Sequence, residues 1–412
     1  MIRYFFGTDL KYKLILEYLL VSFLLFSTLF CRPYLLVVSF DGFRHDYLDR
    51  VKTHNFDEII KKGSSSTLIS VFPSLTFPNH YSIATGTYAG THGIVANSFY
   101  RKDYNEIYSY RDKSTVIDGK WYGAEPIWVT AERQGIKSAT YFWVGSEAEI
   151  NGFRPSIYKN YNNDVTFQER LDTVFDWFSL PLNDRPQLCM LYFNEPDHSG
   201  HKYGPESSEV DNAVIEMDKL LGIITKKINS LPIKDSLNLV VLSDHGMTTI
   251  DSKKFIFLDK HINGINDLRV DGYGPISQLF LHPTKISRKK SVFKQLLRIP
   301  NINAYLKKDI PQDYKIINEN TGDFLIVADE GWSIFKNKKQ STNFNPIGMH
   351  GYNPSLESMK SIFIAYGPQI RSDFKLDPIE NVNIYPLFCE LLGIKPYSGS
   401  QGNLLEISKI LK

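Results

Sequence analysis

Acidic and histidine side chains recur at the ends of short apolar runs in this sequence. Three aspartates each follow such a run, and three histidines stand next to a glycine, where backbone can approach closely. Carboxylates and imidazoles are the ligands that zinc accepts in catalytic sites with open positions. Two divalent cations held in this way can clamp the attacking and leaving oxygens of a phosphoryl displacement. The candidate metal ligands are Asp41, Asp197, His201, Asp244, His245 and His350.

Each of these residues alone would fit an ordinary role. A strand-end aspartate usually closes a turn or caps a helix, and a single histidine is usually a surface or satisfied core residue. Three carboxylates that converge on one edge of a sheet would repel one another unless a cation lies between them. The combination, rather than any single residue, therefore predicts a metal centre.

A threonine between two prolines is the candidate nucleophile. Thr76 lies in the segment 72–81, where Pro73 and Pro78 restrict the backbone. A helical run is expected to begin at residues 82–85, and a helix amino end offers free N–H groups and positive potential that suit a phosphate. A threonine hydroxyl is a weak nucleophile at its free pKa, and zinc beside it would favour the ionised form. Without this context Thr76 would be an ordinary turn residue.

Continuous apolar runs carry the candidate ligands. Runs of this length and β-branched content are typical of strands buried on both faces, and helical periodicity lies between them. Alternating strands and helices predict an α/β fold with a mainly parallel central sheet and helices on both faces. Ligands of such sheets bind at the carboxyl ends of the strands, where the aspartates stand. The predicted strands span residues 34–40, 188–193, 238–243 and 361–366, and the predicted helices residues 206–228 and 380–392.

The amino-terminal segment predicts export. Lys11 and Lys13 precede an apolar run over residues 14–30 that only Glu17 interrupts. A basic segment before such a run is typical of a secretory signal peptide, and the run is also marginally long enough for an uncleaved membrane anchor. We therefore predict that residues 1–31 are a signal peptide or signal anchor. The protein is then secreted, periplasmic or attached to the outer side of a membrane.

Composition limits the remaining possibilities. Residues 32–412 are enough for one large catalytic domain, in which the lysine-rich stretch of about 250–345 is predicted to be an inserted cap region. The formal net charge is +2, and no basic block stands out, so we expect no binding of duplex nucleic acid. Three cysteines in 412 residues exclude a disulfide-rich scaffold. The expected partner is a small nucleotide or phosphodiester.

Seven segments together resemble the ectonucleotide pyrophosphatase/phosphodiesterase family of the alkaline-phosphatase superfamily. The resemblance runs in order from about residue 34 to residue 405. It implies an alkaline-phosphatase-like fold and hydrolysis of nucleotide phosphodiester or pyrophosphate bonds, with release of nucleoside 5′-monophosphates. The segments are residues 39–44, 72–81, 93–97, 143–146, 195–201, 243–247 and 350–352.

The resemblance also implies a role for each site residue. Thr76 would attack phosphorus and form a covalent phospho-threonine that water then cleaves, and Asn97 would donate to a non-bridging phosphate oxygen. Phe77 and Tyr161 fall where nucleotide-hydrolysing members stack a base, although simple core packing explains both equally well. One of two Zn²⁺ ions would be held by Asp41, Thr76, Asp244 and His245, and the other by Asp197, His201 and His350.

Two departures from the family pattern leave the substrate open. Leu75 stands where nucleotide-hydrolysing members often carry lysine, and Val144 and Glu147 change the segment after Trp143. A phosphodiesterase for choline lipids or other head groups is therefore one alternative, and a phosphomonoesterase is another. A catalytically inactive surface-binding protein on the same fold is the alternative of a different class.

Overall fold

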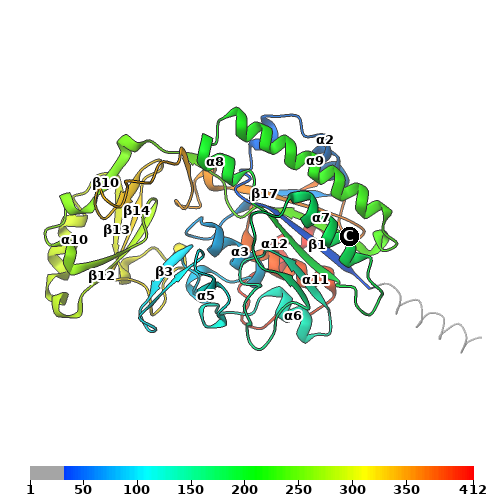
Figure 1. Ribbon diagram of the computed structural model, residues 1–412, viewed down its shortest axis with the longest axis horizontal. Coiled ribbons are helices and arrows are strands. Elements are labelled where there is room, and N and C mark those ends of the chain that lie inside the picture. The colour runs from blue at the N-terminus through cyan, green and yellow to red at the C-terminus, as the bar shows by residue number, and fades with distance from the viewer. Residues whose placement is uncertain (1–31) are drawn as a thin grey trace, which may run out of the picture.

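The computed structural model describes residues 32–412, so the predicted signal or anchor segment lies outside the described residues. Within that part of the chain, no helix is long and apolar enough to cross a bilayer. The described residues form a large α/β body and a smaller β-rich body beside it (Figure 1).

A nine-stranded sheet forms the centre of the large body. Its order is β18-β2-β17-β8-β1-β7-β5-β6, with β19 also paired to β2. Strands β8, β1, β7, β5 and β6 are parallel neighbours, whereas β17 runs antiparallel to both β8 and β2. The prediction of a mainly parallel sheet is thus confirmed. The strands are β1 (Tyr34–Phe40), β2 (Ser64–Ile69), β5 (Ser138–Tyr141), β6 (Ile157–Lys159), β7 (Leu188–Phe193), β8 (Leu237–Leu242), β17 (Ser361–Tyr366), β18 (Phe374–Lys375) and β19 (Ile379–Glu380).

Helices cover both faces of this sheet, as predicted (Figure 1). The alternation of side chains in β1 shows why: Leu35 and Val37 enter one hydrophobic core, and Leu36, Val38 and Phe40 enter the other. One face carries α2 (His54–Lys62), α7 (Phe167–Phe178) and α9 (Ser208–Ser230), and the opposite face carries α3 (Thr76–Thr85), α6 (Ile127–Arg133), α11 (Ile384–Leu392) and α12 (Leu404–Ile407).

The two predicted helices are present with shifted ends. Helix α9 begins at Ser208 because the Ser207 side chain caps it by accepting a hydrogen bond from the Val210 N–H. Helix α11 begins at Ile384, since residues 381–383 form a single 3₁₀ turn instead.

The smaller body is built largely from the predicted cap region. An antiparallel sheet of order β11-β12-β14-β13 packs with α10 around a hydrophobic cluster of its own. A hairpin, β3 (Ser98–Arg101) and β4 (Glu106–Ser109), lies between the two bodies (Figure 1). The boundaries of an inserted cap stay a prediction. The elements are β10 (Phe255–Phe257), β11 (Leu268–Asp271), β12 (Ile276–Leu281), α10 (Lys289–Leu296), β13 (Ile302–Leu306), β14 (Phe324–Ala328) and β15 (Ser333–Phe335).

Candidate metal centre and active site

Three neighbouring parallel strands end at the candidate site. Asp41 follows β1 directly, Asp244 and His245 follow β8, and Asp197 begins α8 (Asp197–Tyr203) shortly after β7. The backbone joins these ends, because Asp197 N donates to Asp41 O at 2.9 Å and Gly42 N donates to Asp244 Oδ1 at 3.2 Å. The predicted convergence of the aspartates at one edge of the sheet is therefore present.

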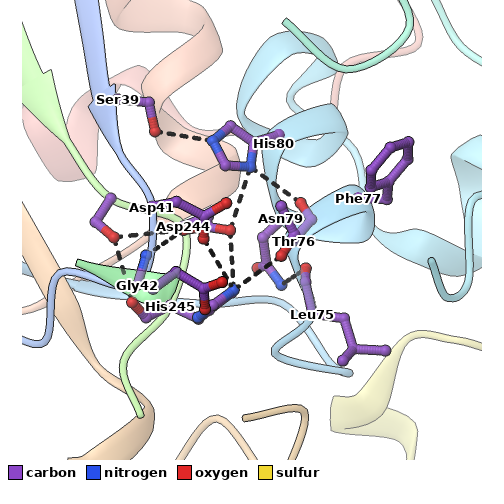
Figure 2. Close-up of polar contacts among 12 residues, drawn as sticks. Ser39, Asp41, Gly42, Leu75, Thr76, Phe77, Asn79, His80, Asp244 and His245 are labelled. Carbon is purple, nitrogen blue, oxygen red and sulfur yellow. Dashed lines mark hydrogen bonds and ion pairs between the residues drawn. The ribbon is translucent and has the colours of Figure 1, made fainter. Parts of the chain in front are cut away.

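Asp41, Thr76, Asp244 and His245 form what we call the inner cluster. His245 Nε2 lies 3.4 Å from Asp41 Oδ1, 3.0 Å from Asp244 Oδ2 and 3.2 Å from Thr76 Oγ1. Figure 2 shows Thr76 facing Asp244 and His245, while the ring of Phe77 points away from them. The two carboxyl groups and the imidazole are almost completely buried.

Asp197, His201 and His350 form what we call the outer cluster. His201 lies one helical turn after Asp197 on α8, and His350 directly follows β16 (Gly348–Met349), which pairs with β9 (Thr248–Thr249) just beyond His245. Asp197 Oδ1 is 3.5 Å from Nε2 of each histidine, and the two Nε2 atoms are 3.2 Å apart. The structure thus brings all seven predicted ligand residues together in two adjoining clusters.

Backbone carbonyls determine which nitrogen of each imidazole carries the proton. Nδ1 of His201, His245 and His350 each lies 2.9 Å from a carbonyl oxygen, of Gly348, Gly246 and Ser74 respectively. A carbonyl can only accept, so each Nδ1 donates and each neutral ring keeps a lone pair on Nε2. The Nε2 atoms of His201 and His350 therefore face one another as two acceptors with no proton between them, an arrangement that suits a shared cation.

The carboxyl groups also fit a cation. Asp41 Oδ2 accepts from the Tyr192 hydroxyl at 2.5 Å, and Asp244 Oδ1 accepts from Gly42 N, so one oxygen of each is held by the protein. The opposite oxygens, Asp41 Oδ1 and Asp244 Oδ2, and also Asp197 Oδ1, are buried without a hydrogen-bond partner among the described residues. Buried polar atoms without a partner are costly, and cations held in the two clusters would satisfy all three.

Electrostatics within the inner cluster separates its two acids. Burial, together with the charges of Asp244 and Asp197, raises the pKa of Asp41 well above its usual range. Burial opposes ionisation of Asp244 too, but His245 and His80 outweigh it and hold the pKa of Asp244 well below its usual range. Burial lowers the pKa of His245, and Asp244 overrides that effect and raises it. A proton and a metal ion thus compete for the same atoms.

Thr76 is the first residue of α3, and this corrects the predicted start of the helix at residues 82–85. Pro78 misled that prediction, although a proline in the first turn of a helix removes only an N–H that has no intrahelical partner. The Thr76 hydroxyl consequently stands at the positive amino end of the helix itself. The Phe77 N–H donates to Asn97 Oδ1 at 3.0 Å, which orients the Asn97 amide and leaves its Nδ2 free to donate elsewhere.

His80 is a site residue to which the sequence interpretation gave no role. It lies one turn after Thr76 on α3, fully buried, with Nδ1 3.1 Å from Thr76 O and 3.2 Å from Asp244 Oδ2 (Figure 2). Its Nε2 lies 2.8 Å from Ser39 Oγ. The spacing of four residues from Thr76 would have indicated this position, had the helix start been placed correctly.

The two aromatic rings predicted to stack a base pack against different neighbours. Phe77 packs against Tyr110, with ring centroids 5.6 Å apart. Tyr161 is 48% exposed and packs against Phe142 at 5.1 Å, and its N–H donates to Glu147 at 3.0 Å. Among the described aromatic pairs, the two rings do not contact each other, so base stacking between them stays a prediction.

Known proteins match both the sequence and the fold. The type I phosphodiesterase / nucleotide pyrophosphatase family matches residues 35–353. The human ectonucleotide pyrophosphatase/phosphodiesterase family member 5 is 36% identical over 408 residues, covering 95% of this chain and 83% of the relative. A bis(5′-adenosyl)-triphosphatase of Xenopus laevis is 36% identical over 379 residues, covering 90% of this chain and 80% of the relative.

Longer relatives and solved structures agree. Family member 1 of Mus musculus is 36% identical over 397 residues, which cover 92% of this chain and 43% of that relative, so the chain spans less than half its length. An inactive variant of the murine family member 5 in complex with AMP superposes with a TM-score of 0.86 at 33% identity, covering 92% of this chain and all of that one. The predicted fold class is thereby confirmed. This chain belongs to the type I phosphodiesterase / nucleotide pyrophosphatase family.

Proposed function

We propose that the protein hydrolyses nucleotide phosphodiester or pyrophosphate bonds with two zinc ions and a phospho-threonine intermediate, and releases nucleoside 5′-monophosphates. The observation that carries this proposal is a set of facing acceptors: two Nε2 atoms lie 3.2 Å apart, and three buried carboxylate oxygens have no donors among the described residues. Membership of the family and the AMP complex of the murine relative support the substrate class.

The inner cluster would hold one zinc and the outer cluster the other. Carboxylate oxygens and imidazole Nε2 atoms are the donor set that zinc accepts, and the Nδ1 bonds to backbone carbonyls fix each imidazole in the tautomer that a ligand needs. Bound zinc would favour the ionised form of a nearby hydroxyl and offset negative charge on the phosphoryl group.

The chain's own residues would position and carry the reaction. Thr76 Oγ1 forms a bond to phosphorus as the bond between phosphorus and the leaving-group oxygen breaks. Water then attacks the phospho-threonine, which restores the Thr76 hydroxyl and frees the nucleoside monophosphate. The amino end of α3 favours the anionic phosphoryl group, and Asn97 Nδ2 would donate to a non-bridging oxygen.

A pair of chromogenic substrates tests the reaction class. We expect thymidine 5′-p-nitrophenyl phosphate, a diester, to be hydrolysed far faster than p-nitrophenyl phosphate, a monoester, by protein containing two zinc ions per chain. Preference for the monoester would replace the proposal with a phosphomonoesterase. Absence of both activities in zinc-loaded protein would favour the inactive surface-binding alternative, and hydrolysis of lysophosphatidylcholine ahead of the nucleotide would favour the choline-lipid alternative.

The names of the relatives and the amino-terminal sequence support a site of action outside the cytoplasm. Relatives bear the prefix "ecto" in their names, and the amino-terminal run of residues 14–30 is typical of an export signal. Fractionation of cells that express the full chain, with activity measured before and after permeabilisation, tests this localisation.

A further inference from the structure

A large cleft opens from one side of the candidate site. Its volume is about 830 Å³, and it reaches the site at Leu75, Asn97, His201 and His350. Residues of the smaller body, such as Tyr273, form the opposite wall. The lining includes neither Phe77 nor Tyr161 but does include Tyr110, whose ring packs 5.6 Å from that of Phe77, so the cleft begins beside the ring proposed to hold the nucleoside and continues to His201 and His350.

Two cationic side chains line this cleft without an acidic partner among the described residues. The Arg111 guanidinium lies 5.2 Å from the centre of the Tyr110 ring, and its Nε donates to the Tyr110 hydroxyl at 2.8 Å. Tyr110 is anchored in turn, because its N–H donates to Asn97 O at 3.0 Å. Lys202 follows the candidate ligand His201 on α8, and its Nζ lies 4.9 Å from the Tyr203 ring. Aromatic neighbours therefore hold both cations while leaving their charge uncompensated.

Asp271, the acidic residue of the cleft lining, is hydrogen-bonded to the backbone of β3. The Asp271 carboxylate accepts a hydrogen bond from the Tyr100 N–H at 2.8 Å, and burial raises the pKa of Asp271. The lining thus carries the two cations Arg111 and Lys202 against one carboxylate that is hydrogen-bonded to β3. A cleft with such a surplus of positive charge attracts anions and disfavours cationic groups such as choline.

We propose that Arg111 and Lys202 determine specificity by binding the phosphate groups of the leaving half of the substrate, beyond the scissile phosphorus. This inference rests on the proposed function, in which the nucleoside monophosphate half lies toward Phe77 and Tyr161. The leaving half would then extend along the cleft, past Tyr110 and toward His201 and His350. Arginine and lysine are the side chains that bind phosphate most often. They supply the positive charge that Leu75, an apolar residue beside the nucleophile, does not.

The test compares two substrates that share a reaction and differ in the leaving group. ATP releases pyrophosphate, which carries phosphate, whereas thymidine 5′-p-nitrophenyl phosphate releases nitrophenolate, which carries none. The readout is the selectivity ratio, kcat/KM for ATP divided by kcat/KM for the nitrophenyl ester. We expect this ratio to fall about tenfold in Arg111→Ala and in Lys202→Ala, and to recover in Arg111→Lys. Added salt should lower the ratio in the unaltered protein and much less in the double variant.

Matched variants control for loss of surface charge. The Arg154 guanidinium also lies over a tyrosine, 6.0 Å from the centre of the Tyr158 ring, and Lys226 is exposed on α9. Neither residue lines the cleft. Arg154→Ala and Lys226→Ala should keep the ratio. If the unaltered protein cleaves both substrates and the ratio is unchanged in Arg111→Ala and Lys202→Ala, this inference is wrong while the proposed function stands. If the unaltered protein cleaves neither substrate, the proposed function itself is wrong.

Discussion

The inner and outer clusters use similar ligands but differ in their contact with water. Asp41, Asp244 and His245 of the inner cluster are at most 1% exposed, and only Thr76 is part-exposed there. In the outer cluster His350 is buried, whereas the side chains of Asp197 and His201 are 17% and 32% exposed. Strand ends of the central sheet and the amino end of α3 assemble the inner cluster, and a short helix and a two-stranded ribbon assemble the outer one. Water can reach the part-exposed His201 when no metal is present, but it cannot reach the carboxylates and the imidazole of the inner cluster. The inner cluster should therefore couple metal binding to folding more strongly.

Thr76, the proposed nucleophile, belongs to the inner cluster, and Thr76→Ala has the largest expected effect. We expect kcat to fall by more than about a thousandfold, because no other described hydroxyl stands at the amino end of α3 beside His245. Zinc content should stay near that of the unaltered protein, since carboxylates and imidazoles remain. Thr76→Ser should keep measurable turnover. Substantial hydrolysis by Thr76→Ala with intact zinc would exclude Thr76 as nucleophile.

Replacing one ligand in each cluster should reveal the difference in burial directly. Asp244→Asn removes a fully buried anion from the inner cluster, and we expect zinc binding there to weaken at least about a hundredfold. His201→Asn should weaken the outer site less, because water can take the place of a ligand that is already part-exposed. Metal analysis after dialysis against graded zinc concentrations measures both. Equal losses in the two variants would mean that burial does not distinguish the clusters.

Asp41 should show opposite effects with and without zinc. The pKa of the Asp41 carboxyl is higher in the folded protein than in the unfolded chain. As pH rises through the unfolded pKa of about 3.9, the unfolded chain ionises first, and the folded protein loses stability. At pH 7, Asp41→Asn should therefore stabilise the zinc-free protein. In Asp41→Asn the new amide can donate to His245 Nε2, 3.4 Å from Oδ1 in the unaltered protein.

Zinc saturation of the unaltered protein should add about 3 kcal/mol at a hundredfold excess over Kd, and that gain should shrink in Asp41→Asn. Urea unfolding with and without chelator gives both values. If Asp41→Asn lowers the unfolding free energy both with and without zinc, the Asp41 carboxyl stabilises the fold by packing and not by binding a cation.

The sequence predicted the buried strands and the ligand set because both leave strong local patterns. The strands at residues 34–40 and 361–366 have the predicted bounds, since uninterrupted apolar runs end where burial ends. The direction of β17 was not predictable, because a strand buried on both faces has the same apolar pattern whether it runs parallel or antiparallel.

Strand β2 and residue His80 escaped prediction for a different reason. Strand β2 reads Ser-Ser-Ser-Thr-Leu-Ile, which is too polar for a central strand, yet it is paired on both edges. Its hydroxyls are satisfied by distant backbone: Ser64 Oγ donates to Arg371 O and Ser66 Oγ to Asp377 O. Such partners lie about 300 residues away in the chain and leave no local signal. His80 depends in the same way on Ser39 and Asp244, which only the folded chain brings near.

A histidine outside the metal clusters separates their acid sensitivity from that of the rest of the fold. His92 ends α4 (Ala89–His92) outside both clusters, where its Nδ1 accepts from Ile94 N at 3.1 Å and its Nε2 lies 2.9 Å from Ser82 Oγ. Burial lowers the pKa of His92 to about 3. Because the folded pKa is depressed, the unfolded chain takes up a proton first, and stability present above about pH 6.5 is lost as pH falls toward 3.

His92→Gln removes the titrating group while an amide can still donate to Ser82 and accept from Ile94. As pH falls from 6.5 to 4, the unfolding free energy should then decrease less steeply than in the unaltered protein. The difference between the two slopes should be about 1.4 kcal/mol per pH unit. Because His92 binds no metal, the change in slope should be the same in zinc-loaded and chelated protein, unlike changes caused by the cluster residues. Urea unfolding at pH 7, 6 and 5 in both conditions measures it. A change in slope that appears only with zinc would mean that His92 is coupled to the clusters. The loss of stability at low pH in the chelated protein would then have to come from other buried groups.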